Sequence, residues 1–449
     1  MLTLRGAVRI LVDDRTERDG DLLIRGGRVV DGAADGDPGA AAGTADGDDE
    51  ALDETLDVSG CVITPGLVNA HHHLLQSAFR TLPGTRGVPM AEWLPTMAAA
   101  YRAVGVDGEL ARASARVGVA EGLLAGVTTV ADHHLTWPSG SDGTAIARGS
   151  ADAAASLGGR LVFVRGSARD DPQEAALSAE AVVAALVPGA AHGIADDGMV
   201  QVAVGPAGVH SDGEETFRLL GEVAARHGLR RRTQANEQVD VAIAADRYGH
   251  RPLDLLDDWG WLADDVTLAH LCGVTAEEIA RLAARGVTAT HAPGCDLPMG
   301  WGIAPVAALL DAGVPVGLGT SGGGSNDAGH LLADARLALQ VAPLVGRPLA
   351  AREALALATG GSARGLGRPE LGHLRPGAAG DACVWDVSGV QDAGVADPVA
   401  GLLWAAPGRR PRHVIVGGRV VVRDGVLVTA EEPALVRDLA DLLAARRAG

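Results

Sequence analysis

Three consecutive histidines, His71, His72 and His73, form the stretch of this sequence with the clearest capacity for chemistry. They follow an apolar run with a Pro-Gly turn, where a buried strand is expected to end. Side chains alternate between the faces of a strand, so His71 and His73 share one face and His72 takes the other. Two imidazoles on one face can supply half of a divalent-metal site. Histidine pairs also occur on surfaces, but the apolar flanks favour a metal site.

The elements that would position these residues alternate between short apolar strands and amphipathic helices. Eight strands are expected, at 62–70, 127–132, 160–165, 200–205, 229–236, 266–270, 287–291 and 314–319. Helical patterns lie between them, for example at 108–125, 214–227 and 276–285. This alternation predicts an α/β fold, a (β/α)8 TIM barrel with its chemistry at the carboxyl ends of the strands.

Both ends of the chain read instead as short, glycine-punctuated strands. We expect residues 1–60 and 375–449 to form one composite β-sandwich domain beside a barrel at 61–374. The small, acidic segment 31–54 lacks large apolar residues and is expected to be a surface loop. An amphipathic helix is expected at 431–447.

Composition restricts the class of protein. A net charge of −19 argues against a nucleic-acid partner, whose phosphates require a basic surface. The sequence contains no apolar run of about 18 residues, so it predicts no membrane span. The four cysteines are scattered without a CxxC pair, and the N-terminus lacks a signal-peptide layout, so we expect reduced thiols in a cytoplasmic protein.

Seven motifs together resemble the amidohydrolase superfamily, in particular its triazine hydrolase, 8-oxoguanine deaminase and chlorohydrolase branch. They are PGLVNAHHHL (65–74), GVTTVADHHLTWP (126–138), VAVGPAGVHS (202–211), Asn236-Glu237, VTLAHL (266–271), HAPGCDLPMGWGIAPV (291–306) and VGLGTSGGGSND (316–327). The resemblance covers almost the whole chain. It implies a hydrolase that uses one divalent metal, zinc or alternatively iron, on a nitrogen heterocycle, and a homodimer as the usual assembly.

The same resemblance assigns roles to individual residues. It implies metal ligands at His71, His73, Gln234 and His270, and catalytic roles for Glu237, His270 and Ser321. Two positions depart from the pattern, since Gln234 stands where a histidine is usual and Ser321 where an aspartate is usual. An amide oxygen is a poorer zinc ligand than imidazole. A serine hydroxyl is no base at neutral pH, so Glu237 would carry most proton transfer. Substrate contacts are implied for Gln76, Trp93, His134, His210 and His291.

Arg232 raises a separate question. It shares strand parity with Gln234 and should face the barrel interior. There its guanidinium could bind an anionic substrate, or it could be held by a nearby carboxylate in a structural role. An ion pair with Glu237 is one form of the structural alternative.

Three functions are compatible with these residues. The first is a metal-dependent hydrolase that deaminates or dechlorinates a purine, pyrimidine or triazine. The second is a specialised biosynthetic enzyme with an altered or absent metal site, catalysing a cyclisation, ring-opening, or C–N or N–N step on an anionic heterocycle. The third is an inactive ligand-binding homologue, against which the joint presence of His71, His73, His270 and Glu237 argues.

Overall fold

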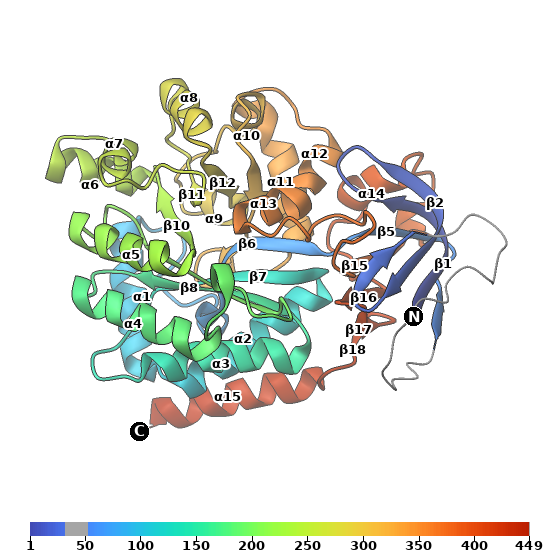
Figure 1. Cartoon of the computed structure of the whole chain (residues 1–449), viewed down its shortest axis with the longest axis horizontal. Coiled ribbons are helices and arrows are strands. Elements are labelled where there is room, and N and C mark those ends of the chain that lie inside the picture. The colour runs from blue at the N-terminus through green and yellow to red at the C-terminus, as the bar shows by residue number, and fades with distance from the viewer. Residues whose placement is uncertain (32–52, 449) are drawn as a thin grey trace.

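The computed structural model describes residues 1–31 and 53–448, which form a barrel and a mixed sheet (Figure 1). The acidic segment expected at 31–54 lies almost entirely outside the described residues. Within the described ranges, no helix is both long and apolar enough to cross a membrane.

Parallel strands in sequence order build the barrel. They are β6 (Leu67–His73), β7 (Val127–His134), β8 (Arg160–Ser167), β9 (Val200–Pro206), β10 (Arg230–Ala235), β11 (Val266–His270), β12 (Thr288–His291), β13 (Val316–Leu318) and β14 (Ser321–Gly322). Each strand from β6 to β12 pairs with the strand that follows it in the sequence, and β14 pairs with β6. Because only Gly319 and Thr320 separate β13 from β14, the sheet closes on itself. The expected barrel is therefore confirmed.

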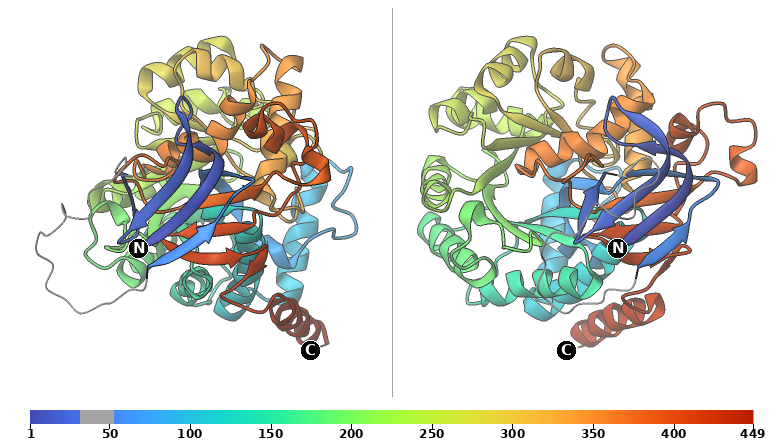
Figure 2. Two further views of the ribbon diagram at one scale, coloured as in Figure 1. Left: turned by 90° about the vertical axis from the view of Figure 1, so that its right-hand side faces the viewer. Right: turned by 45° about the vertical axis from the view of Figure 1, so that its right-hand side comes forward.

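Helices cover the outside of this barrel, as the right-hand view of Figure 2 shows. They are α1 (Met90–Val104), α2 (Gly108–Leu124), α3 (Gly143–Leu157), α4 (Pro172–Leu186), α5 (Glu214–His227), α6 (Gln238–Tyr248), α7 (Pro252–Asp258), α8 (Ala276–Arg285), α10 (Val306–Asp311), α11 (Leu331–Val341) and α12 (Ala351–Ala356). Apart from α1, whose buried residues belong to two smaller clusters, their apolar faces pack with the outward side chains of the strands into one continuous core.

The two chain ends meet in a mixed sheet beside the barrel (Figure 2). Its strands are β1 (Leu2–Leu11), β2 (Glu17–Arg25), β3 (Arg28–Val30), β4 (Glu54–Asp57), β5 (Cys61–Pro65), β15 (Ala382–Asp386), β16 (His413–Val416), β17 (Arg419–Arg423) and β18 (Val426–Leu427). Strands from both termini pair through β5, and their inward side chains share one core. Two further helices are α14 (Pro398–Trp404) and α15 (Glu432–Ala448), and α15 packs on α2.

The strand expected at 62–70 is in fact two strands that belong to different sheets. β5 pairs with β1 and β15 in the mixed sheet, whereas β6 begins the barrel. Gly66 lies between them, and its amide donates to the Asp381 carbonyl at 2.9 Å. A Cβ at Gly66 would lie 2.3 Å from Thr128 Oγ1, so only glycine fits this close approach. The barrel thus starts at Leu67, later than the expected boundary at residue 61.

A short helix, α13 (Ser362–Leu366), fills the amino-terminal end of the barrel. Its last carbonyls accept hydrogen bonds from Gln201 and Thr267, which lie near the starts of their strands. Inward apolar residues of the strands pack on its Ala363 and Leu366. This end of the barrel is therefore packed solid, and the polar side chains gather at the other end.

Candidate active site

Four histidine rings meet at the carboxyl ends of three barrel strands. The ring centroid of His71 lies 4.9 Å from that of His73, 5.3 Å from that of His270 and 5.8 Å from that of His133. Strands β6 and β11 thus bring together the three histidines predicted as metal ligands. His133, at the end of β7, is an addition that the sequence did not single out.

Hydrogen bonds fix the orientation of two of these rings. His73 Nδ1 lies 2.6 Å from the carbonyl oxygen of His133, and His270 Nδ1 lies 2.6 Å from Asp296 Oδ1. A histidine that donates its Nδ1 proton to an oxygen presents Nε2 to a metal, which is the usual arrangement in metal sites. The Nε2 atom of His71 is buried and has no hydrogen-bond partner in the described chain. Since buried polar atoms are normally paired, these three imidazoles fit a divalent metal.

Gln234 lies at the edge of this group. Its Oε1 atom is 3.2 Å from His270 Nε2, so the side chain points into the site as strand parity predicted. Burial lowers the pKa of His270, but the charge and hydrogen bond of Asp296 outweigh it and raise the pKa overall. Without metal, His270 can therefore donate from Nε2 to the Gln234 amide oxygen, and a metal would displace that proton.

Glu237 directly precedes α6 and is completely buried. Both of its carboxylate oxygens lack hydrogen-bond partners within the described chain, and one lies 3.5 Å from His270 Nε2. Burial raises its pKa, although His270 and His210 oppose this. A carboxyl group whose pKa is raised accepts a proton more readily than an exposed glutamate, which suits it to proton transfer.

Arg232 does not pair with Glu237, nor with any other carboxylate of the described residues. Its buried guanidinium crosses the barrel interior and donates to the carbonyls of Ala70 on β6 and Gly365 on α13. Burial, followed by the charge of Arg230, lowers the pKa of Arg232 to about 9. Neither carboxylate partner considered from the sequence, a nearby carboxylate or Glu237, is found among the described residues, and carbonyl oxygens accept these hydrogen bonds instead. These contacts favour a structural role over anion binding.

Gln76 and Trp93, both implied as substrate contacts, hold the glycine-rich loop after β14. Gln76 Oε1 accepts from the Gly324 amide at 2.9 Å, and Trp93 Nε1 donates to the Gly324 carbonyl at 3.1 Å. A Cβ on Gly322 would lie 1.9 Å from Gln76 Oε1, so this turn requires glycine. The two side chains therefore shape one wall of the site through the loop backbone.

His210 lies beside Asp240, and His291 lies beside Asp296. Burial lowers the pKa of His210, but its contact with Asp240, whose Oδ1 is 3.3 Å from His210 Nδ1, and the charge of Glu237 raise it overall. Burial lowers the pKa of His291 to about 4, so this ring is neutral at pH 7. Neither ring nitrogen of His291 has a hydrogen-bond partner among the described residues, which leaves both available to a ligand.

His134 does not join the cluster. Its ring faces the outer helices, stacks on Phe163 at 6.0 Å and places Nε2 2.9 Å from the Thr136 carbonyl. His133, one residue earlier, faces the interior and lies parallel to His73. A shift of one residue moves a strand side chain to the opposite face, so His134, which we expected to contact substrate, points away from the cluster, whereas His133 points into it.

Ser321 forms the first residue of β14, where it pairs with His72. Its φ is 53°, and His270 and Asn236 also have positive φ, 73° and 55°. Left-handed backbone at a residue other than glycine costs free energy and gathers at functional sites. His270 ends β11, Asn236 follows β10 and Ser321 begins β14, so all three lie at the end of the barrel that carries the histidine cluster, which supports this region as the active site.

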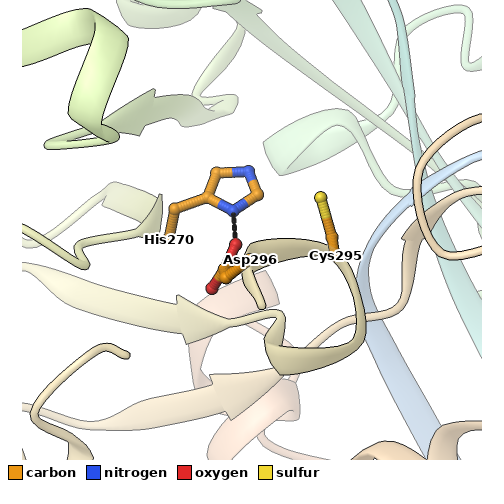
Figure 3. A group of neighbouring side chains, drawn as sticks. All are labelled: His270, Cys295 and Asp296. Atoms are coloured by element: carbon orange, nitrogen blue, oxygen red, sulfur yellow. Dashed lines mark hydrogen bonds and ion pairs between the residues drawn. The ribbon is translucent and has the colours of Figure 1, made fainter. Parts of the chain in front are cut away.

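Cys295 and Asp296 are functional candidates that the sequence reading missed. They end the short helix α9 (Pro293–Asp296), and with His270 they bring a nitrogen, a sulfur and an oxygen atom within 4.8 Å of one another (Figure 3). Burial, followed by the charge of Asp296, raises the pKa of the Cys295 thiol, so it is protonated at neutral pH. Asp296 Oδ1 already bonds His270. We therefore favour His71, His73 and His270 as the metal ligands. The polar Cys-Asp pair soon after strand-end His291 was the available signal.

Comparison with known proteins identifies the family and several relatives of this chain. The amidohydrolase family pattern matches residues 62–421. The chain belongs to the amidohydrolase family. An 8-oxoguanine deaminase from Pseudomonas aeruginosa is 33% identical over 445 residues, which cover 96% of each chain. A 5-methylthioadenosine/S-adenosylhomocysteine deaminase from Halobacterium salinarum is 33% identical over 432 residues, 95% of this chain and 94% of the other.

Among solved structures, the atrazine chlorohydrolase TrzN from Arthrobacter aurescens TC1, complexed with zinc, superimposes with a TM-score of 0.87. It is 34% identical, and the match covers 99% of this chain and all of the other. These relatives are hydrolases. The resemblance to the amidohydrolase superfamily that the motifs indicated is confirmed, and so is the predicted barrel.

Proposed function

We propose that this amidohydrolase removes an amino or chloro substituent from a carbon atom of a nitrogen heterocycle. The observation that carries the proposal is the pair of unpaired Glu237 carboxylate oxygens beside His270 Nε2. A buried carboxyl group without a partner costs stability, and its position next to three converging imidazoles gives it a catalytic use.

His71, His73 and His270 would hold the metal, with Gln234 beside them. When bound, a divalent cation supplies Lewis acidity, which acidifies water and polarises an electron-poor ring carbon. Zinc is the first choice because three imidazoles suit it and because the related chlorohydrolase structure contains zinc.

The residues of this chain would divide the remaining work. Glu237 takes the proton from the attacking water and delivers it to a ring nitrogen or to the leaving group, which its raised pKa favours. His210, whose pKa is raised, donates a hydrogen bond to an electron-rich ring atom. The neutral His291 orients the heterocycle. Ser321 cannot act as a base, so proton transfer depends on Glu237.

The alternative biosynthetic activity on an anionic heterocycle loses one of its supports. It depended on Arg232, Gln234 and Ser321, and the guanidinium of Arg232 already has two carbonyl partners. If the protein only bound a ligand, the lack of hydrogen-bond partners for the Glu237 carboxylate and for His71 Nε2 in the described chain would have no explanation. Hydrolysis is therefore the better supported function.

The test is turnover by the zinc-loaded protein. We would incubate it with 8-oxoguanine, 5-methylthioadenosine, isoxanthopterin and atrazine, and measure ammonia or chloride release. Glu237→Gln provides the control for contaminating activity. Release from at least one compound that disappears in this variant supports the proposal. No release from any of them, or a metal content that stays below about a tenth of an equivalent after zinc loading, overturns it.

A further inference from the structure

We propose that Asp296 is a positioning residue that orients His270 through a hydrogen bond while its other oxygen faces His291, so that one carboxylate borders both the metal-binding side of the site and its substrate-binding side. The inference rests on the proposed function, because it assigns His270 to the metal and His291 to the substrate. It concerns a residue at the end of α9, outside the barrel strands.

Each oxygen of Asp296 faces a different histidine, and only the contact with His270 is a hydrogen bond. Oδ1 lies 2.6 Å from His270 Nδ1, and Oδ2 lies 3.7 Å from His291 Nδ1. All three side chains are at most 1% exposed. Water therefore does not compete for these contacts, and a hydrogen bond to a charged group is strongest in such surroundings.

The chain holds Asp296 in place from several directions. Its amide donates to the Ala292 carbonyl at 3.0 Å, and its carbonyl accepts from the Trp301 amide at 3.0 Å. Two residues earlier, the Gly294 amide donates to Asp334 Oδ1 of α11 at 2.8 Å. A Cβ on Gly294 would lie 2.2 Å from that oxygen, so the turn of α9 is pressed against α11. Asp296 is thus rigidly placed before any ligand binds.

His270 is held from two sides as a result. Asp296 fixes Nδ1, and the ring of Trp301 packs edge-on at a centroid distance of 5.0 Å and an angle of 90°. The ring cannot flip without losing both contacts, so Nε2 stays directed at Gln234 and Glu237. Removing a residue that hydrogen-bonds a metal-ligating histidine typically weakens metal binding by about 10–100-fold.

An alternative interpretation is that Asp296 and Cys295 are themselves metal ligands, because their ligand atoms and that of His270 lie within 4.8 Å of one another (Figure 3). The protonated Cys295 thiol and the use of Oδ1 by His270 argue against it. The two readings predict different behaviour of Cys295, which the experiment below uses.

The experiment compares full-length wild type, Asp296→Asn and Cys295→Ser. Zinc affinity is measured by competition with a chromophoric chelator, without substrate, and thermal unfolding followed by circular dichroism checks the fold. We expect Asp296→Asn to weaken zinc binding by about 10–100-fold. We expect Cys295→Ser to change it by less than about threefold, because the thiol is not a ligand. Loss of zinc binding in both variants would identify Asp296 and Cys295 as ligands and overturn the proposal.

A spectroscopic readout covers the case in which Asp296→Asn fails to fold. Proton NMR of the wild type should show a strongly deshielded Nδ1 proton of His270, shared with a carboxylate, and folded Asp296→Asn should lose it. Absence of this signal from the wild type, or its persistence in the variant with unchanged zinc affinity, would overturn the proposal. Because no substrate is used, failure of every heterocycle to react would refute the proposed function while leaving these results interpretable.

Discussion

Arg232 donates a hydrogen bond across the barrel interior to the carbonyl of Ala70, the residue that immediately precedes His71. Its second bond reaches Gly365 near the end of α13. A single guanidinium therefore ties the strand that carries two metal-ligand candidates to the helix that fills the barrel. Arginine suits this role because its planar fork can serve two acceptors at once.

Replacing Arg232 tests whether this role is structural. We expect Arg232→Met to lower the free energy of unfolding by roughly 2 kcal/mol or more, because the buried Ala70 and Gly365 carbonyls each lose one hydrogen bond and the barrel interior loses the packed arginine side chain. Urea unfolding measures the change. Arg218→Met is the matched control, since Arg218 forms only exposed ion pairs on α5 and such pairs contribute about 0–1 kcal/mol. Unchanged stability, together with a selective rise in KM for carboxylate-bearing heterocycles, would instead support anion binding.

Glu237→Gln isolates proton transfer from metal binding. The amide keeps the shape of the side chain but cannot accept a proton, so kcat should fall by about 10²–10⁴-fold. Zinc content, measured by elemental analysis, should stay at the wild-type value because Glu237 is not among the proposed ligands. A decrease in kcat of less than about threefold would remove Glu237 from the mechanism.

Gln234→His restores an imidazole at a position where the family resemblance leads us to expect one. Gln234 Oε1 already lies 3.2 Å from His270 Nε2, so the new ring would enter the ligand group. We expect zinc to bind about tenfold more tightly or better, because imidazole is the stronger zinc ligand. Chelator competition measures this, with Gln234→Ala as the control. Equal or weaker binding by the histidine variant would show that the site cannot use a fourth imidazole.

Asp132 makes stability depend on pH. Its Oδ1 accepts from the Leu74 amide at 2.8 Å, Oδ2 is buried without a partner in the described chain, and burial raises its pKa from 3.8 to about 7. The folded state therefore binds this proton more tightly than the unfolded state. The resulting stabilisation is complete below pH 3.8 and is lost as pH rises to 7 and beyond.

Asp132→Asn removes that titration. The stability of the variant relative to the wild type should increase steadily between about pH 4 and pH 8, because only the wild type must bury a carboxylate at the alkaline end. Urea unfolding at several pH values gives the difference, in which the contributions of other groups cancel. A difference that stays constant with pH would show that Asp132 does not titrate in this range.

The sequence predicted those parts of the site that depend on position within one strand. Parity placed His71 and His73 together and Gln234 on the inner face, and alternating elements predicted the barrel. Parity was not enough for His133 and His134, because both end the same strand and either could face inward. The division of 62–70 at Gly66 was also hidden, since both halves are apolar and fully buried.

The partners of Asp296 could not be predicted for a different reason, although the Cys-Asp pair was visible in the sequence. The importance of Asp296 comes from the meeting of α9 with the ends of β11 and β12, which no local pattern encodes. The same holds for the partners of Arg232, which lie on β6 and α13. Contacts between elements distant in the chain decide these roles.

Because α13 closes the amino-terminal end of the barrel, the site opens only at the carboxyl ends of the strands. Substrate, water and the released heterocycle must all pass the rim formed by the loops at the carboxyl ends of the strands. A product that leaves slowly would then block the next substrate outright. We expect the heterocyclic product to inhibit competitively, and we expect traffic through the rim to limit turnover once chemistry is fast.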